Sequence, residues 1–307
     1  MGPITRTTVA LAATGAAGLA YALIESRLFT VRHFDVPVLA PGSDPLRVLH
    51  LSDVHMTPNQ RAKQAWLHGL AELAPDLVVN TGDNLSHLDA VPSVLRAYGD
   101  LLDLPGVFVF GSNDYFSPRP PKWTDYLRGG SGVGARGAWA RDPDLPFDQL
   151  REAFTQRGWI DLTNRHDDLT IAGRRLAFVG VDDPHLQRDV LDSEPADVSA
   201  DVSIGVTHAP YLRVLDQWNR SGYRLILAGH THGGQLRIPF YGALVTNCDL
   251  EPARARWLHQ HAIDGHDPSW LHVCAGAGSS PYAPVRFACR PEASLLTLTA
   301  VDSPGSL

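Results

Sequence analysis

The chain has 307 residues, of which 44% are hydrophobic, and its 33 acidic against 26 basic residues give a formal net charge of −7. This composition excludes an intrinsically disordered chain, a disulfide scaffold built on its three cysteines, and a polytopic membrane protein. The acidic balance also argues against a general nucleic-acid binder, because affinity for phosphate backbones needs a concentrated face of Lys and Arg, so no nucleic-acid partner is expected.

The first predicted element is an N-terminal helix. Residues 7–24 carry no charge and lie between Arg6 and Glu25, and as a helix they would span about 27 Å, close to the hydrocarbon thickness of a bilayer. We expect residues 1–32 to form a hydrophobic segment and flank that attaches the chain to a membrane as a single-pass anchor. Two alternatives stay open, a signal peptide cleaved after Ala20-Tyr21-Ala22 and a soluble helix. The flanking charges favour neither side of the membrane.

Residues 33–307 are predicted to form one α/β domain. From Leu46 onward, short apolar runs alternate with amphipathic stretches, which is typical of buried strands in a layered α/β protein. Strands are expected at 47–52, 76–80, 106–110, 175–181, 202–208, 223–229, 271–276 and 293–300, and helices near 60–73, 89–103, 147–157 and 210–219. The later strands favour a second sheet packed on the first.

One stretch, residues 115–146, interrupts this alternation and is rich in Pro, Gly and Arg. Its cations are Arg119, Lys122, Arg128, Arg136 and Arg141. Loops of this length inside a compact domain are usually functional or disordered. Two interpretations therefore stay open: a solvated insertion loop, and a lid whose cations, Arg119 among them, contact an anionic substrate.

Side chains able to bind a metal follow most of the predicted strands. In chain order they are Asp53, His55, Asp83, Asn113, Asp114, His208, His230 and His232. Any one of them has an ordinary explanation as a turn or solvated residue. Because the carboxyl ends of strands in an open α/β sheet share one edge, where ligands collect, we expect the whole set to converge in space.

The chemistry of this set predicts a metal centre. Carboxylates, imidazoles and an amide oxygen suit Mn, Fe or Zn better than calcium, which prefers oxygen ligands alone. Four histidines and two aspartates are more than one tetrahedral ion needs, so we expect two divalent metal ions bridged by a carboxylate and a water. Such pairs recur in phosphatases and nucleases, because two cations generate hydroxide at neutral pH and stabilise charge on a phosphoryl group.

The motifs D-x-H, G-D, a G-x-N turn, a single His and G-H-x-H, in this order between Leu46 and Ala300, resemble those of the calcineurin-like metallophosphoesterases. Within that family, G-H-T-H-G-G-Q and the segment 276–298 resemble a membrane-linked bacterial branch that includes phosphodiesterases and UDP-2,3-diacylglucosamine pyrophosphatases. The resemblance implies a four-layer α/β/β/α sandwich of two mixed sheets. It also implies ligands for two metals: Asp53, His55 and His232 for one, His208, His230 and an Asn for the other, and Asp83 as the bridge.

The third motif departs from the family pattern. Gly111-Ser112-Asn113-Asp114 stands where the family has G-N-H-D or G-N-H-E, so either Ser112 or Asn113 is the second-metal ligand. We favour Asn113, because an amide oxygen is a better neutral ligand than a serine hydroxyl. The family histidine, which usually acts as proton donor or stabilises the transition state, is missing.

A replacement for that histidine is open. Asp114, His87 and His185 are candidate proton donors, and His185 and Arg119 are the residues expected to contact substrate. Alternatively, the leaving group is already stable as an anion and needs no acid, which favours pyrophosphates or activated diesters.

These observations lead to a ranked set of functions. The leading hypothesis is a membrane-associated dinuclear phosphoesterase that hydrolyses a phosphodiester or pyrophosphate bond of a lipid-linked or nucleotide-linked substrate by attack of a metal-bridging hydroxide. The altered third motif motivates a second hypothesis, a non-catalytic or regulatory metal-binding module. A nuclease is third, because the sequence shows no basic, aromatic-lined groove.

Overall fold

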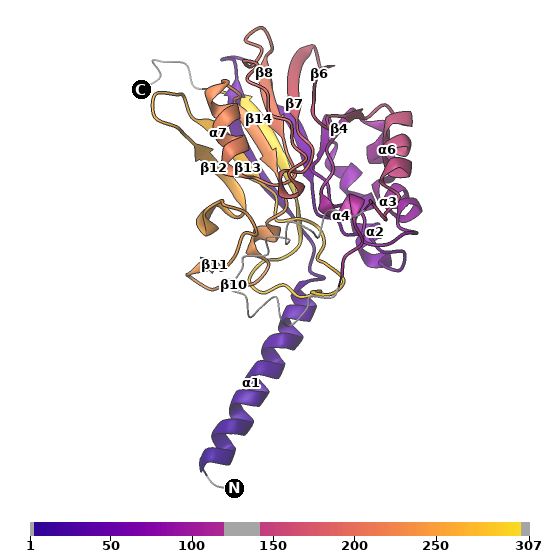
Figure 1. The fold of residues 1–307 in the computed structure, drawn as a ribbon, viewed down its shortest axis with the longest axis vertical. Helices are drawn as coiled ribbons and strands as arrows, with labels where there is room; N and C mark the ends of the chain where they lie inside the picture. Colours follow the sequence, from indigo (N-terminus) through magenta and orange to yellow (C-terminus); the bar gives the residue numbers. More distant parts are fainter. Residues whose placement is uncertain (1–2, 120–141, 302–307) are drawn as a thin grey trace.

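The structure is a computed structural model that describes residues 3–119 and 142–301. It begins with helix α1 (Pro3–Glu25), which projects from one end of a domain built on two packed sheets (Figure 1). The end of α1 contacts the domain, where Ala22 and Glu25 are buried. No helix in the part of the chain that the structure describes is both long and apolar enough to cross a membrane. The single-pass anchor and the cleaved signal stay predictions.

Sheet 1 has six strands in the order β1-β14-β2-β3-β4-β5. Their bounds are β1 Thr30–Leu39, β14 Glu292–Ala300, β2 Leu46–Leu51, β3 Leu77–Asn80, β4 Gly106–Phe108 and β5 Ile160–Asp161. All neighbours pair in parallel except β14 and β2, which are antiparallel. β1 was not among the predicted strands, and it crosses the boundary that the sequence analysis places at residue 33.

Sheet 2 also has six strands, in the order β12-β13-β9-β8-β7-β6. Their bounds are β12 Trp257–His261, β13 Ser269–Val273, β9 Leu225–Ala228, β8 Val202–Val206, β7 Arg174–Gly180 and β6 Arg165–Ile171. The four central strands are parallel and the two edge strands antiparallel. A separate hairpin joins β10 (Arg237–Ile238) to β11 (Gly242–Ala243). The predicted pair of mixed sheets is thereby confirmed.

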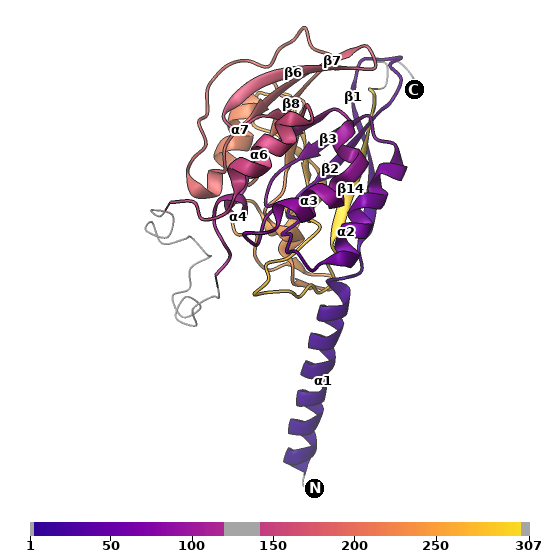
Figure 2. The same ribbon diagram turned by 90° about the vertical axis from the view of Figure 1, so that its right-hand side faces the viewer.

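Helices cover the outer face of each sheet (Figures 1 and 2). On sheet 1 they are α2 (Arg61–His68), α3 (Val91–Tyr98) and α6 (Phe147–Gln156), with the short 3-10 helices η1 (Gly69–Leu73) and η2 (Gly99–Asp103), and on sheet 2 α7 (Leu212–Arg220). In β2, Val48 packs into the core between the sheets while Leu49 packs under the helices, because successive side chains of a strand point to opposite faces. Burial on both faces explains why the central strands are continuous apolar runs.

Residues 120–141 of the predicted insertion lie outside the described residues, and with them Lys122, Arg128, Arg136 and Arg141. The described flanks are held together, since the backbone N–H groups of Asp144 and Leu145 donate to the carbonyl of Tyr115 at 2.9 and 3.1 Å. Arg119, at the edge of the described part, is exposed. A lid formed by this segment stays a prediction.

Candidate metal centre

The predicted ligands lie on segments that follow the carboxyl ends of β2, β3, β4, β8 and β9, with Asn113 in the short helix α4 (Ser112–Tyr115). Five of them adopt left-handed backbone, with φ of 45° at His55, 49° at Asp53, 50° at His232, 57° at Asp83 and 69° at His230. Such conformations are unfavourable for residues other than glycine and persist where the surrounding structure imposes them, commonly at functional sites. The fold therefore imposes strained backbone on the segments that carry these five residues.

Two motif glycines let these loops approach one another. A Cβ at Gly229 would collide with Ser52 and with the carboxylate of Asp53, and a Cβ at Gly111 would collide with Asp83 and the ring of His208. Any larger residue would force the loops apart. Gly111 of the G-S-N-D motif and Gly229 of the G-H motif therefore contribute by their lack of a side chain, which allows the ligand residues to pack closely.

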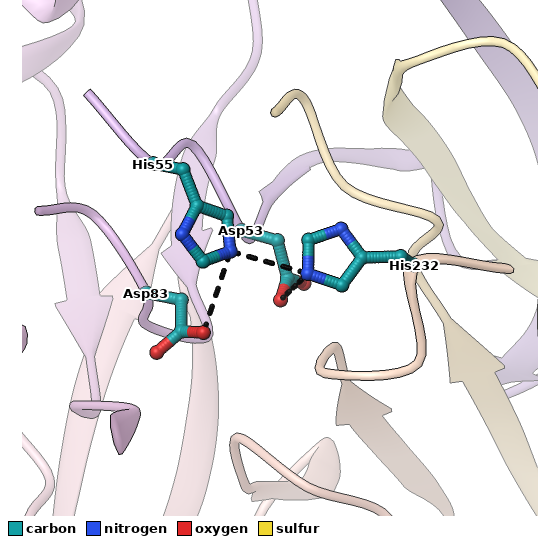
Figure 3. A group of neighbouring side chains, drawn as sticks. All are labelled: Asp53, His55, Asp83 and His232. Carbon is teal, nitrogen blue, oxygen red and sulfur yellow. Dashed lines mark hydrogen bonds and ion pairs between the residues drawn. The ribbon is translucent and has the colours of Figure 1, made fainter. Parts of the chain in front are cut away.

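Four of the side chains form a compact group (Figure 3). Asp53, His55, Asp83 and His232 offer ligand atoms that all lie within 4.8 Å of one another. The Nε2 of His55 lies 3.1 Å from Nε2 of His232 and 3.5 Å from Oδ2 of Asp83. Oδ1 of Asp53 is buried, and within the described chain no hydrogen-bond donor reaches it. An unsatisfied buried carboxylate oxygen beside two imidazole nitrogens fits a cation.

A second pair of histidines, His208 and His230, also lies beside Asp83. The Nε2 of His208 is 3.3 Å from Nδ1 of His230 and 3.5 Å from Oδ2 of Asp83. Asn113 contacts the same carboxylate, since its backbone N–H and its Nδ2 donate to Oδ1 and Oδ2 of Asp83 at 2.7 and 2.8 Å. Asp83 is therefore shared by both histidine pairs.

The far nitrogen of each of these four imidazoles faces an oxygen. The pairs are His55 Nδ1 with Ser86 Oγ at 3.1 Å, His208 Nδ1 with the Thr81 carbonyl at 2.7 Å, His230 Nε2 with the Asn247 carbonyl at 3.2 Å, and His232 Nδ1 with the Gly278 carbonyl at 3.2 Å. A ring N–H donated to these outer oxygens leaves a lone pair on each inner nitrogen. Metal-binding histidines are commonly oriented in this way.

Burial favours the neutral form of three of these histidines. It lowers the pKa of His55 and of His230 well below the usual histidine value, and that of His232 to about 3. The neutral imidazole is the form that binds a metal ion.

His208 differs from them. Burial alone would lower its pKa, but the carboxylates of Asp83, Asp183 and Asp53 outweigh burial and raise it to about 9.

The third motif separates the roles of its residues. Asp114 is fully buried, and its carboxylate accepts from the backbone N–H groups of Asp83, Asn84, Leu85 and Gly111 at 2.8 to 3.3 Å. Burial and the neighbouring Asp83 raise the pKa of Asp114 to about 7, although these N–H groups favour its charged form. Both oxygens of Asp114 thereby join the segments that carry Asp83 and Asn113. Its role as proton donor stays a prediction.

The three other candidates lie in different places. His185, on the 3-10 helix η3 (Pro184–Leu186), has its ring centroid 4.7 Å from that of His230, and its Nδ1 lies 3.0 Å from the hydroxyl of Tyr211. His87 is exposed, and its Nδ1 accepts from the backbone N–H of Asp89 at 3.0 Å. His185 is thus placed beside the ligands, whereas His87 and the exposed Arg119 are not brought against them by any contact within the described chain.

Two further residues of the site were not predicted. Asp183 follows β7 and is fully buried, with Oδ1 accepting from the N–H of His185 at 2.8 Å, and burial raises its pKa to about 7. The V-D-D-P-H segment, which follows a predicted strand, could have indicated Asp183. Arg286 is fully buried too, and it donates to the carbonyls of Ala275 and Gly278 while its Nη2 lies 3.3 Å from Nδ1 of His232. Nothing in the local sequence marks Arg286.

The sequence of this chain is similar to those of known proteins. A family model described as calcineurin-like phosphoesterase matches residues 46–234, a range that holds all the predicted metal ligands. The chain is 25% identical over 257 residues to the uncharacterized metallophosphoesterase YkoQ of Bacillus subtilis (strain 168), covering 82% of this chain and 83% of that protein. It is also 25% identical over 308 residues to the uncharacterized metallophosphoesterase YkuE of the same organism, covering 95% and 93%.

Among solved structures, the 5'-nucleotidase precursor from Thermus thermophilus matches with a TM-score of 0.41 and 13% identity. The match covers 83% of this chain and 55% of that one, so this chain spans little more than half of its length. The narrower resemblance to a membrane-linked bacterial branch stays a prediction.

Proposed function

Because this chain belongs to the calcineurin-like phosphoesterase family, we propose that it is a phosphoesterase with two metal positions that share Asp83. One observation carries the proposal: Oδ2 of Asp83 lies 3.5 Å from Nε2 of His55 and 3.5 Å from Nε2 of His208, one member of each histidine pair. A carboxylate in that place can reach a cation on either side. The donor set of imidazole nitrogens and carboxylate oxygens suits Mn, Fe or Zn.

Different residues would bind the metal ion at each of the two positions. Asp53, His55 and His232 hold the first metal position, and His208, His230 and Asn113 the second. Two divalent ions bound there would supply hydroxide at neutral pH and offset the charge of the phosphoryl oxygens. The outer oxygens of Ser86, Thr81, Asn247 and Gly278 hold the four rings in orientation, so the ligands need little rearrangement when ions bind.

The class of bond follows from the third motif. Asn113 is no acid, and the carboxylate of Asp114 is occupied by backbone N–H groups, so neither is placed to protonate a leaving group. A substrate whose leaving group is stable as an anion needs no such acid. We therefore favour phosphodiesters and pyrophosphates over alkyl phosphomonoesters as substrates.

The test pairs metal content with turnover on the full chain. Bound metal is measured by elemental analysis, and hydrolysis of bis-p-nitrophenyl phosphate is compared with that of p-nitrophenyl phosphate in the presence of Mn²⁺. We expect two ions per chain and turnover of the diester, whose leaving group, p-nitrophenolate, is stable as an anion. One ion or none, with no turnover of either ester under Mn²⁺, Fe²⁺ or Zn²⁺, would overturn the proposal and favour the non-catalytic metal-binding module that the altered third motif suggests.

A further inference from the structure

Exposed apolar side chains gather at the end of the molecule from which α1 projects. Among the described residues, the large apolar side chains that are exposed lie in segments 19–28 and 236–245 or at Tyr282, apart from Leu88, Val190 and Val198. Segment 236–245 contains the β10–β11 hairpin, which lies at the same end as α1 (Figure 1). We call segments 19–28 and 236–245 the apolar end. Concentrations of exposed apolar surface mark sites of interaction.

The two segments of the apolar end form one continuous surface. A cavity of about 530 Å³ lies between them, lined by Leu19 and Ala22 of α1 and by Leu236, Ile238 and Leu244 of the hairpin segment. Its wall is completed by Val285 and Phe287, and the ring of Tyr21 packs edge-on against Phe287 with centroids 5.3 Å apart.

The hairpin turn is the most exposed part of this surface. The side chain of Phe240 is fully exposed, at 111% of its reference area, and that of Tyr241 is 76% exposed. An aromatic pair at the tip of a short hairpin is unfavourable in water, and aromatic side chains are favoured at the boundary between lipid and water.

Cations border the apolar end. Arg27 and Arg61 are exposed and line a second cavity of about 490 Å³ together with Leu23 and Phe29. Arg290, also exposed, donates to the carbonyls of Leu28 and Phe29 at 2.6 and 2.9 Å. Apolar side chains beside cations match the acyl and anionic headgroup layers of a bilayer, which attracts basic groups close to its surface.

The apolar end is also joined to the metal centre. The hairpin segment starts two residues after the end of η4 (His232–Gly234), and beyond its other end the carbonyl of Asn247 lies 3.2 Å from Nε2 of the ligand His230. On the α1 side, the carboxylate of Glu25 accepts from the backbone N–H groups of Ala288 and Cys289, both at 2.8 Å. A surface that holds the hairpin and α1 would thereby hold the metal centre close to itself.

We propose that the apolar end docks on the surface of a lipid bilayer, with Phe240 and Tyr241 entering the interface and Arg27 and Arg61 contacting anionic headgroups. The proposal does not depend on the catalytic activity proposed above. It requires no helix that crosses the membrane, because the hairpin and the end of α1 together supply the contact.

The test is co-sedimentation of the full chain with vesicles. Vesicles of phosphatidylglycerol and phosphatidylethanolamine are compared with vesicles of phosphatidylcholine alone. We expect the double variant Phe240→Asp/Tyr241→Asp to lose at least about tenfold in partition to the anionic vesicles, the scale of losing one buried aromatic side chain. Val198→Asp is the matched control, because Val198 is 100% exposed but lies outside the apolar end, and it should bind like the unaltered chain. Arg27→Glu/Arg61→Glu should weaken binding to the anionic vesicles only.

Circular dichroism and hydrolysis of a soluble diester verify that the variants are folded, and Phe240→Ser alone provides a milder change in the same direction. Unchanged partition of the double variant would overturn the proposal, as would failure of the unaltered chain to bind either kind of vesicle. Self-association that the double variant abolishes, without vesicle binding, would assign the surface to a second copy of the chain and would also overturn it.

Discussion

The metal centre has two halves, the first with His55 and His232 and the second with His208 and His230. The histidines of both halves are oriented in the same way, but the remaining ligands differ. Each half has two imidazoles whose far nitrogens face outer oxygens. The first half adds Asp53, a carboxylate ligand of its own, whereas the second has the neutral side chain of Asn113 and shares the carboxylate of Asp83. Imidazole orientation is therefore common to both halves, whereas the charge of the ligands is not. We therefore expect the first half to bind a divalent cation more tightly.

The largest expected effect comes from the residue that both halves share. Asp83→Asn removes the charge that each half needs, so diester turnover with Mn²⁺ should fall by more than about a hundredfold, above the range for losing a residue that only orients a ligand. Steady-state hydrolysis of bis-p-nitrophenyl phosphate measures it. Asp89→Asn, an exposed carboxylate nearby, is the control and should keep full activity. An active Asp83→Asn protein would show that the halves do not share this residue.

Removing one histidine from each half should separate the two positions. His232→Ala and His230→Ala should each lower bound metal by one ion per chain in elemental analysis, with His232→Ala costing the tighter ion. His185→Ala should leave metal content unchanged, since its ring lies beside His230 and its Nδ1 faces Tyr211. Loss of metal in the His185 variant would contradict the assignment of the second half.

Either Ser112 or Asn113 completes the second half as a metal ligand. Asn113 contacts both oxygens of Asp83, while Ser112 lies 3.4 Å from Nδ2 of Asn113. Asn113→Ala should therefore weaken Mn²⁺ binding at the second position about tenfold to a hundredfold, and Ser112→Ala by less. Calorimetric titration of Mn²⁺ into the chelated protein measures both, and the opposite order would make Ser112 the ligand.

A third pair of buried histidines has no carboxylate hydrogen-bonded to it among the described residues. His50 and His272 are fully buried between the sheets, with their Nδ1 atoms 2.8 Å apart and Nε2 of His50 facing the Thr81 hydroxyl. Burial lowers the pKa of His50 to about 3 and that of His272 well below its usual value. Below pH 6.5 the unfolded chain takes up protons that the folded chain does not, so the free energy of unfolding falls as the pH falls.

For His50 alone this loss is about 1.4 kcal/mol per pH unit below about pH 6.5. We expect His50→Gln to reduce the pH dependence of stability in chelator-treated protein by that amount, measured by urea unfolding at several pH values between 5 and 7.5. An unchanged slope would mean that His50 is protonated in the folded protein.

The sequence was sufficient to predict that these side chains converge, because each follows a buried apolar run, and strand ends in such a fold meet at one edge. It was insufficient for strands with polar faces. β6 contains Asp167 and Asp168 and β12 reads W-L-H-Q-H, and both are edge strands whose exposed positions interrupt the apolar pattern. β1 and Arg286 were missed for another reason, since their roles come from contacts with segments far away in the chain.

The position of β14 has a consequence for how the protein is made. β14 comes after every other strand of sheet 1 in the sequence, yet it lies between β1 and β2 and pairs with both. As the chain leaves the ribosome, β1 has no neighbour until residues 292–300 emerge, and contacts this distant in sequence form slowly. The hydrogen bonds of the Glu25 carboxylate likewise cannot form until Ala288 and Cys289 have been synthesised. α1 is therefore synthesised before the domain but is fixed to it among the last elements.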